Sequence, residues 1–133
     1  MSDKIKIFVV DDSKIGQVML SKMLSDASDD IEIIAETTTA FGALFMLEDI
    51  KPDIIMLKLN IPGDMESHDA LRQIREKCPN IYIVLCPMPQ DRSDLDDFIR
   101  EGKADNFLPK PIKQITLERL LARYVEYRNR GKE

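Results

Sequence analysis

Short apolar runs alternate along the chain with longer segments in which apolar residues recur every three or four positions. The runs lie at residues 5–10, 31–35, 54–57, 81–86 and 106–108 and are dominated by Ile, Val and Leu. Short runs that are apolar throughout are typical of strands buried on both faces of a sheet. The segments between them and after the last run predict helices, so five strands should alternate with five helices.

Each predicted helix is defined by a stripe of apolar residues at helical spacing. The five stripes are Ile15, Val18, Met19, Met23; Phe41, Leu44, Phe45, Leu47; Leu71, Ile74, Cys78; Leu95, Phe98, Ile99; and Leu117, Leu120, Leu121, Tyr124, Val125. Ser13 is positioned to cap the first helix, because serine side chains accept the free N–H groups of a helix start. Pro52 and Pro79 mark the ends of the second and third helices, since a residue before proline avoids helical angles. We expect the stripes to form the core.

This alternation predicts an α/β fold with a doubly wound, five-stranded parallel sheet covered by helices on both faces. The length of 133 residues, without a linker or repeat, predicts one domain over residues 1–133. In such folds the functional crevice lies at the carboxyl ends of the strands. The candidate site residues at these ends are Asp11, Asp12, Lys58, Asn60, Cys86 and Lys110.

Composition and charge narrow the class of protein further. Apolar residues make up 44% of the chain and charged residues 32%, and the longest apolar run has six residues, which is too short to span a membrane. Two cysteines, Cys78 and Cys86, do not resemble a disulfide scaffold, so we expect a reducing, cytoplasmic location. With one histidine, His68, a zinc-type site is excluded in practice.

The net charge of −5 is unevenly distributed. Residues 110–133 carry seven Lys and Arg against three Glu, whereas residues 1–109 carry twelve basic and twenty-one acidic side chains. The acidic body argues against a nucleic-acid binder, and no membrane partner is expected. The basic segment could contact an acidic partner, although a solvated helix face is the commoner explanation.

The adjacent carboxylates Asp11 and Asp12 have no packing reason to follow a buried strand. Two close carboxylates repel each other unless a cation lies between them. Magnesium is one such cation and a lysine is another. From these two residues alone, a helix N-terminus capped by acidic side chains is an equally good explanation.

The strand ends together resemble a known family. The matching segments are residues 9–13 (VVDDS), 52–57 (PDIIML), 61–63 (IPG) and 106–111 (NFLPKP). In this order and spacing they resemble the response-regulator receiver domain, the CheY-like module of bacterial two-component signalling, over essentially the whole chain. The resemblance implies a flavodoxin-like sheet with strand order 2-1-3-4-5.

The resemblance also implies roles for individual residues. Receivers accept a phosphoryl group from a histidine kinase onto an aspartate at the end of the third strand. By position, Asp11 and Asp12 match the acidic pair that holds magnesium, and Asn60 matches the residue whose backbone carbonyl completes that metal site. Lys110 matches the phosphate-binding lysine, and Phe107 matches the aromatic switch residue.

Three positions depart from the family pattern. Lys58 occupies the phospho-acceptor position and cannot form an acyl phosphate, Cys86 replaces the expected hydroxyl, and Pro87 has no backbone N–H to offer. We expect Cys86 to be a small residue filling a strand end, the alternative being a thiolate activated by neighbouring lysines.

The four charged pocket residues, Asp11, Asp12, Lys58 and Lys110, sum to zero. Lys58 is therefore expected to replace the metal by pairing with the two aspartates, the alternative being that it extends into water. No cofactor is expected, and magnesium only if the remnant acidic pocket still binds it.

The sequence therefore predicts a degenerate receiver in two-component or phosphorelay signalling. We expect a phosphorylation-independent protein-interaction module and no enzymatic activity. By resemblance, a protein partner or a second copy would bind the face of the fourth helix, fifth strand and fifth helix. That face would carry Asp94, Asp96, Asp97, Arg100, Phe107, Arg119, Arg123 and Tyr127. The alternatives are a phosphorylatable switch that uses Asp11 or Asp12, and a laboratory variant of an active receiver altered at position 58.

Overall fold

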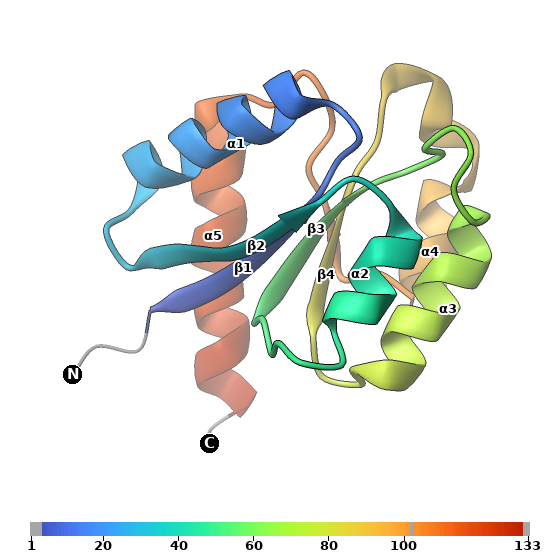
Figure 1. The fold of residues 1–133 in the computed structure, drawn as a ribbon. Helices are drawn as coiled ribbons and strands as arrows, with labels where there is room; N and C mark the ends of the chain where they lie inside the picture. The colour runs from blue at the N-terminus through green and yellow to red at the C-terminus, as the bar shows by residue number, and fades with distance from the viewer. Residues whose placement is uncertain (1–3, 102, 132–133) are drawn as a thin grey trace.

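The computed structural model describes residues 4–101 and 103–131, with the side chains of residues 92–94, including Asp94, outside the description. Five strands alternate with helices along these residues (Figure 1). The elements are β1 (Ile5–Val10), α1 (Lys14–Ala27), β2 (Ile31–Thr37), α2 (Ala40–Met46), β3 (Ile54–Lys58), α3 (Ser67–Lys77), β4 (Tyr82–Cys86), the 3-10 helix η1 (Pro89–Asp94), α4 (Leu95–Arg100), β5 (Asn106–Phe107) and α5 (Gln114–Gly131).

The strands form one parallel sheet in the order β2-β1-β3-β4-β5, which confirms the predicted topology. The order reverses at β1, so β1 and β3 lie side by side in the middle of the sheet. Lys58 ends β3 and pairs in register with Cys86, the last residue of β4. The carboxyl ends of β1, β3 and β4 therefore meet at one edge, where this fold class binds its ligands.

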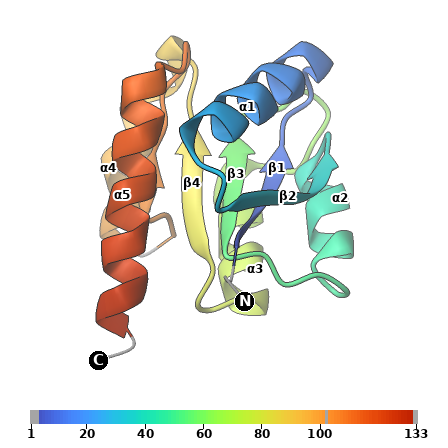
Figure 2. The same ribbon diagram turned by 90° about the vertical axis from the view of Figure 1, so that its left-hand side faces the viewer.

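Helices cover both faces of the sheet (Figures 1 and 2). On one face, α1 and α5 pack against alternate strand residues such as Val9 and Met56. On the other face, α2, α3 and α4 pack against the intervening residues, such as Phe8 and Leu57. The central strands β1, β3 and β4 thus contribute to both apolar clusters, which is why nearly all of their residues are apolar.

The apolar stripes predicted for the first two helices are only partly confirmed. Met23, Leu44 and Leu47 lie in or against the core, but the other members do not. Ile15 is 73% exposed on α1 and Phe45 is 77% exposed on α2, and Val18, Met19 and Phe41 are exposed as well. The buried residues of α1 are Gln17, Leu20 and Leu24, and those of α2 are Ala40 and Ala43. Both helices have apolar residues on two faces, so periodicity alone could not identify the inward one.

The predicted stripes of the third and fifth helices are confirmed. Leu71 and Ile74 on α3 are buried, as are Leu117, Leu120, Leu121 and Tyr124 on α5. The η1 turn before α4 was not predicted. No helix within the described residues is long and apolar enough to cross a membrane.

Candidate functional site

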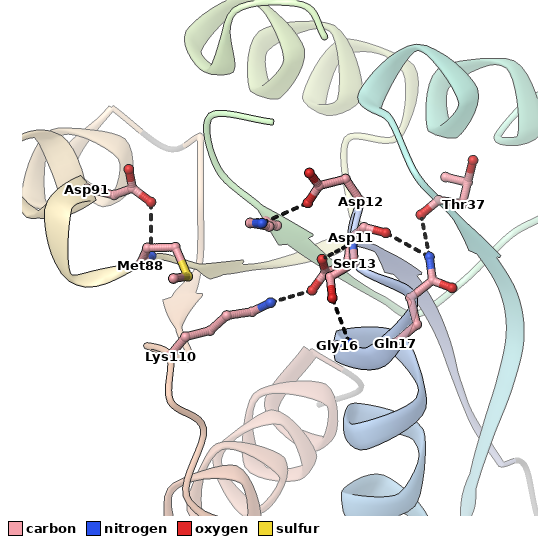
Figure 3. A network of polar contacts seen from close by, with 10 residues as sticks. Asp11, Asp12, Ser13, Gly16, Gln17, Thr37, Met88, Asp91 and Lys110 are labelled. Carbon is pink, nitrogen blue, oxygen red and sulfur yellow. Dashed lines mark hydrogen bonds and ion pairs between the residues drawn. The ribbon is translucent and has the colours of Figure 1, made fainter. Parts of the chain in front are cut away.

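The candidate site lies where β1, β3, β4 and β5 end. Asp11 and Asp12 follow β1, Lys58 and Cys86 end β3 and β4, and Lys110 follows β5. Figure 3 shows that Lys110 reaches across from the end of β5 to Asp11 and Asp12 at the end of β1. The structure therefore brings together the pocket residues that the sequence separates by up to 99 positions.

Asp11 is the buried centre of the site, with 4% of its surface exposed. One carboxylate oxygen accepts the Ser13 N–H at 2.9 Å, and the other forms an ion pair with the Lys110 ammonium (Figure 3). The α1 backbone comes close to this carboxylate at Gly16, where an added Cβ would lie 2.8 Å from Asp11 Oδ2. A glycine at this position is what allows the helix to start beside a buried acid.

Gln17 on α1 is hydrogen-bonded to the backbone of Asp11. Its side chain is 2% exposed, and its amide donates to the Asp11 carbonyl at 2.8 Å and to the Thr37 carbonyl at 3.1 Å. One buried amide thus joins the ends of β1 and β2, as Figure 3 shows. This role of Gln17 could not be predicted from the sequence, because it depends on which face of α1 points inward.

Asp12 pairs with the lysine that ends β3. The Lys58 Nζ lies 2.7 Å from Asp12 Oδ1, with the two side chains 18% and 34% exposed. The hydrogen bond from Lys58 lowers the pKa of Asp12, and the same bond raises the pKa of Lys58. Lys58 therefore folds back onto the acidic pair and does not extend into water. Among residues 4–101 and 103–131 its hydrogen-bond partner is Asp12, whereas Asp11 is bonded to Lys110.

Cys86 and Pro87 line the β4 side of the site. Cys86 is buried, and burial raises its thiol pKa to about 12. The thiol therefore stays protonated at neutral pH, which contradicts the activated-thiolate alternative and fits a small residue that fills the strand end. The Pro87 carbonyl accepts the Lys110 N–H at 2.8 Å, so the β4 and β5 ends are joined through the backbone.

Asn60 has a left-handed backbone, with φ at +55°, a conformation that asparagine tolerates better than most residues. Its side-chain amide donates to Asp91 Oδ1 at 2.7 Å. The other Asp91 oxygen accepts the Met88 N–H at 2.9 Å (Figure 3). Asp91 was not among the predicted site residues. A sequence signal for it exists, because an acid three residues after the start of a helical turn often accepts the N–H of the capping residue.

The predicted switch and contact residues lie on the β5 side of the molecule. Phe107, the predicted switch residue, is partly buried and packs against the core on the α4 side. Tyr127 is half exposed on α5. His68 is the second residue of α3, and its ring lies 4.5 Å from the Phe98 ring.

The pocket residues do not fit a magnesium ion in this arrangement. Magnesium takes one or two carboxylates together with further oxygen ligands. Here each aspartate of the pair already binds an ammonium, and the third carboxylate that the family uses is a lysine. Within residues 4–101 and 103–131, no group of three or more His, Cys, Asp or Glu side chains could hold a metal ion.

Comparison with known proteins assigns the chain to a family. The sequence profile of the response regulator receiver domain matches residues 7–122. The chemotaxis protein CheY of Listeria monocytogenes is 29% identical over 109 residues, which cover 82% of this chain and 88% of that protein. The chain therefore belongs to the response regulator receiver domain family of two-component signalling.

Other relatives are longer proteins. The protein-glutamate methylesterase/protein-glutamine glutaminase of Pyrococcus horikoshii is 30% identical over 117 residues, which cover 88% of this chain but 31% of that protein. The match is thus confined to a part of that enzyme. The REC domain of AraT, a response regulator from Geobacillus stearothermophilus, shares the fold over 100% of both chains, with a TM-score of 0.79 at 22% identity.

Proposed function

We propose that this receiver domain works without phosphorylation, as a protein-interaction module in two-component or phosphorelay signalling. The observation that carries the proposal is the Lys58–Asp12 ion pair at the phospho-acceptor position. An amine that is protonated and bonded to a carboxylate cannot act as a nucleophile toward phosphorus. The Lys58 and Lys110 ammonium groups together balance the two negative charges of Asp11 and Asp12, so the acidic pair is neutralised within the chain.

The β4 side of the site supports the same proposal. Phosphoryl transfer depends on donors that neutralise the oxygens of the transferred group. Cys86 offers a weak donor and Pro87 offers none. Lys110 remains, but its ammonium is bonded to Asp11. Three groups that would bind a phosphoryl group are therefore replaced or already engaged, and we infer that the domain has no catalytic role.

We place the partner on the surface formed by α4, β5 and α5. β5 is an edge strand, with α4 and α5 on opposite faces of the sheet beside it. Ile99 and Tyr127 are large side chains that remain exposed there. A protein partner or a second copy of the chain could cover them. We also propose that residues 1–133 form one receiver domain with a cytoplasmic location. Neither a nucleic acid nor a membrane is proposed as a partner.

The experiment is intact-mass measurement after incubation with acetyl phosphate and magnesium. The proposal predicts no phosphoryl adduct on the unaltered protein. A stoichiometric adduct would overturn it, and mapping of the acid-labile site to Asp11 or Asp12 would establish the alternative of a switch with a relocated acceptor.

The variant Lys58→Asp separates a degenerate receiver from a laboratory variant. If position 58 were the only altered residue, restoring the carboxylate should give a stoichiometric adduct. A degenerate receiver should remain poorly reactive, because Cys86 and Pro87 still fail to bind the phosphoryl oxygens. The native codon at position 58 provides an independent check.

A further inference from the structure

One carboxylate connects two loops beside the pocket. Asp91, at the start of η1, accepts the Asn60 side-chain amide on Oδ1 at 2.7 Å and the Met88 N–H on Oδ2 at 2.9 Å. Asn60 belongs to the loop between β3 and α3, and Met88 follows β4. Asn60 and Asp91 are 31 positions apart in sequence, and their side chains are bonded directly to each other.

Asn60 is itself held in place from α3. Its backbone N–H donates to the Ser67 hydroxyl at 3.1 Å, and that hydroxyl lies 3.3 Å from Asn60 Oδ1. The left-handed backbone at Asn60 is therefore fixed by the first residue of α3. The amide that reaches Asp91 is consequently oriented before the bridge forms.

The segment that Asp91 holds has few internal degrees of freedom. Pro87 and Pro89 each fix one backbone angle on either side of Met88. The Pro87 carbonyl accepts the Lys110 N–H, so the segment is already bonded to the end of β5. The Asp91 bridge attaches its other end to the β3 side, and η1 then leads directly into α4.

We propose that the Asn60–Asp91 bridge holds the segment between β4 and α4 in one position, so that Asp91 is a positioning residue for α4. This inference deepens the proposed function, because it names the bond that would fix the interaction face without a phosphoryl group. The acceptor in this bridge is a carboxylate, and its charge also contributes to the raised pKa of Lys58. A hydrogen bond to a charged carboxylate is stronger than one between neutral groups.

The test is amide hydrogen exchange of residues 88–100, measured by NMR on the full chain. The two single variants are Asn60→Gly, which keeps the left-handed backbone, and Asp91→Ala. Both should speed exchange in this segment about tenfold, which corresponds to the loss of one such bond. The double variant should exchange no faster than Asp91→Ala alone. Asp49→Ala removes an exposed acid from the turn after α2, outside this segment, and should change nothing, as the control.

An unchanged exchange rate in Asn60→Gly would overturn the inference, because Asp91 would then serve only as a cap for Met88. Fully additive effects in the double variant would overturn it as well, since they would show two independent contacts. The exchange result is separate from the acetyl phosphate result. A phosphoryl adduct would remove the proposed function and leave the bridge itself standing.

Discussion

The two ion pairs at the pocket use the same chemistry in different surroundings. Asp11 and Lys110 meet in the interior, and Asp11 also accepts the Ser13 N–H and lies beneath the α1 backbone. Asp12 and Lys58 meet nearer the surface, with Asp12 34% exposed. The inner pair is therefore part of the framework, whereas the outer pair is the one that we propose takes the place of a metal ion.

The largest expected effect comes from removing the inner carboxylate. Asp11→Ala should lower the free energy of unfolding by about 3 kcal/mol, because it leaves the Lys110 ammonium and the Ser13 N–H without their partner. Urea unfolding provides the measurement, and Asp12→Ala is the matched control, with a smaller loss. Equal losses in the two variants would contradict the distinction between the pairs.

Gly16 tests how tightly α1 approaches the inner pair. Gly16→Ala should destabilise the protein by about 1 kcal/mol, although alanine has the better helix propensity, because its Cβ would lie 2.8 Å from Asp11 Oδ2. The loss should disappear in an Asp11→Ala background, where the obstructing carboxylate is gone. Gly131→Ala, with open space around its Cβ, is the control. A loss of the same size in both backgrounds would show that the carboxylate is not the obstacle.

A double-mutant cycle measures the outer pair. Lys58→Met, Asp12→Asn and the double variant should give a coupling energy of about 1 kcal/mol, since the pair is only partly exposed. Urea unfolding at low and at high salt supplies the numbers, and high salt should reduce the coupling. A coupling energy of zero would mean that the bond observed here contributes nothing to stability.

The pH dependence of that coupling should be the smallest effect. The pKa of Asp12 is lowered by Lys58, so the stabilisation is present above the ordinary aspartate pKa and is lost as the pH falls through the lowered value. The pKa of Lys58 is raised, so the stabilisation is complete below the ordinary lysine pKa and is lost as the pH rises through the raised value. The difference in unfolding free energy between the unaltered protein and Lys58→Met should therefore form a plateau around neutral pH. A steady slope across neutral pH would require another titrating group.

The sequence was sufficient for the sheet and for the residues at its carboxyl edge. Strand runs that are almost entirely apolar predict a sheet covered on both faces, and the order of motifs then determines which strand ends meet. The sequence also suggested an ammonium near the acidic pair. It did not indicate which aspartate would form an ion pair with which lysine, since that depends on how deeply each side chain is buried.

The sequence did not predict the buried face of a helix that has apolar residues on two faces. It also did not predict a site residue whose role depends on a single long-range contact. On α1 and α2, apolar residues occupy both faces, so the predicted stripes mixed exposed residues such as Ile15 and Phe45 with core residues such as Leu47. Gln17 was overlooked for the same reason. Asp91 was overlooked because its partner Asn60 lies on another loop and reaches it only in the folded chain.

Magnesium titration followed by backbone NMR shows whether Lys58 takes the place of a metal ion. If it does, the amide signals of Asp11, Asp12 and Lys58 should show no saturable shift at millimolar magnesium. Lys58→Asp restores the third carboxylate and should produce a saturable shift at the same signals. Tight, saturable binding of magnesium by the unaltered protein would contradict the account.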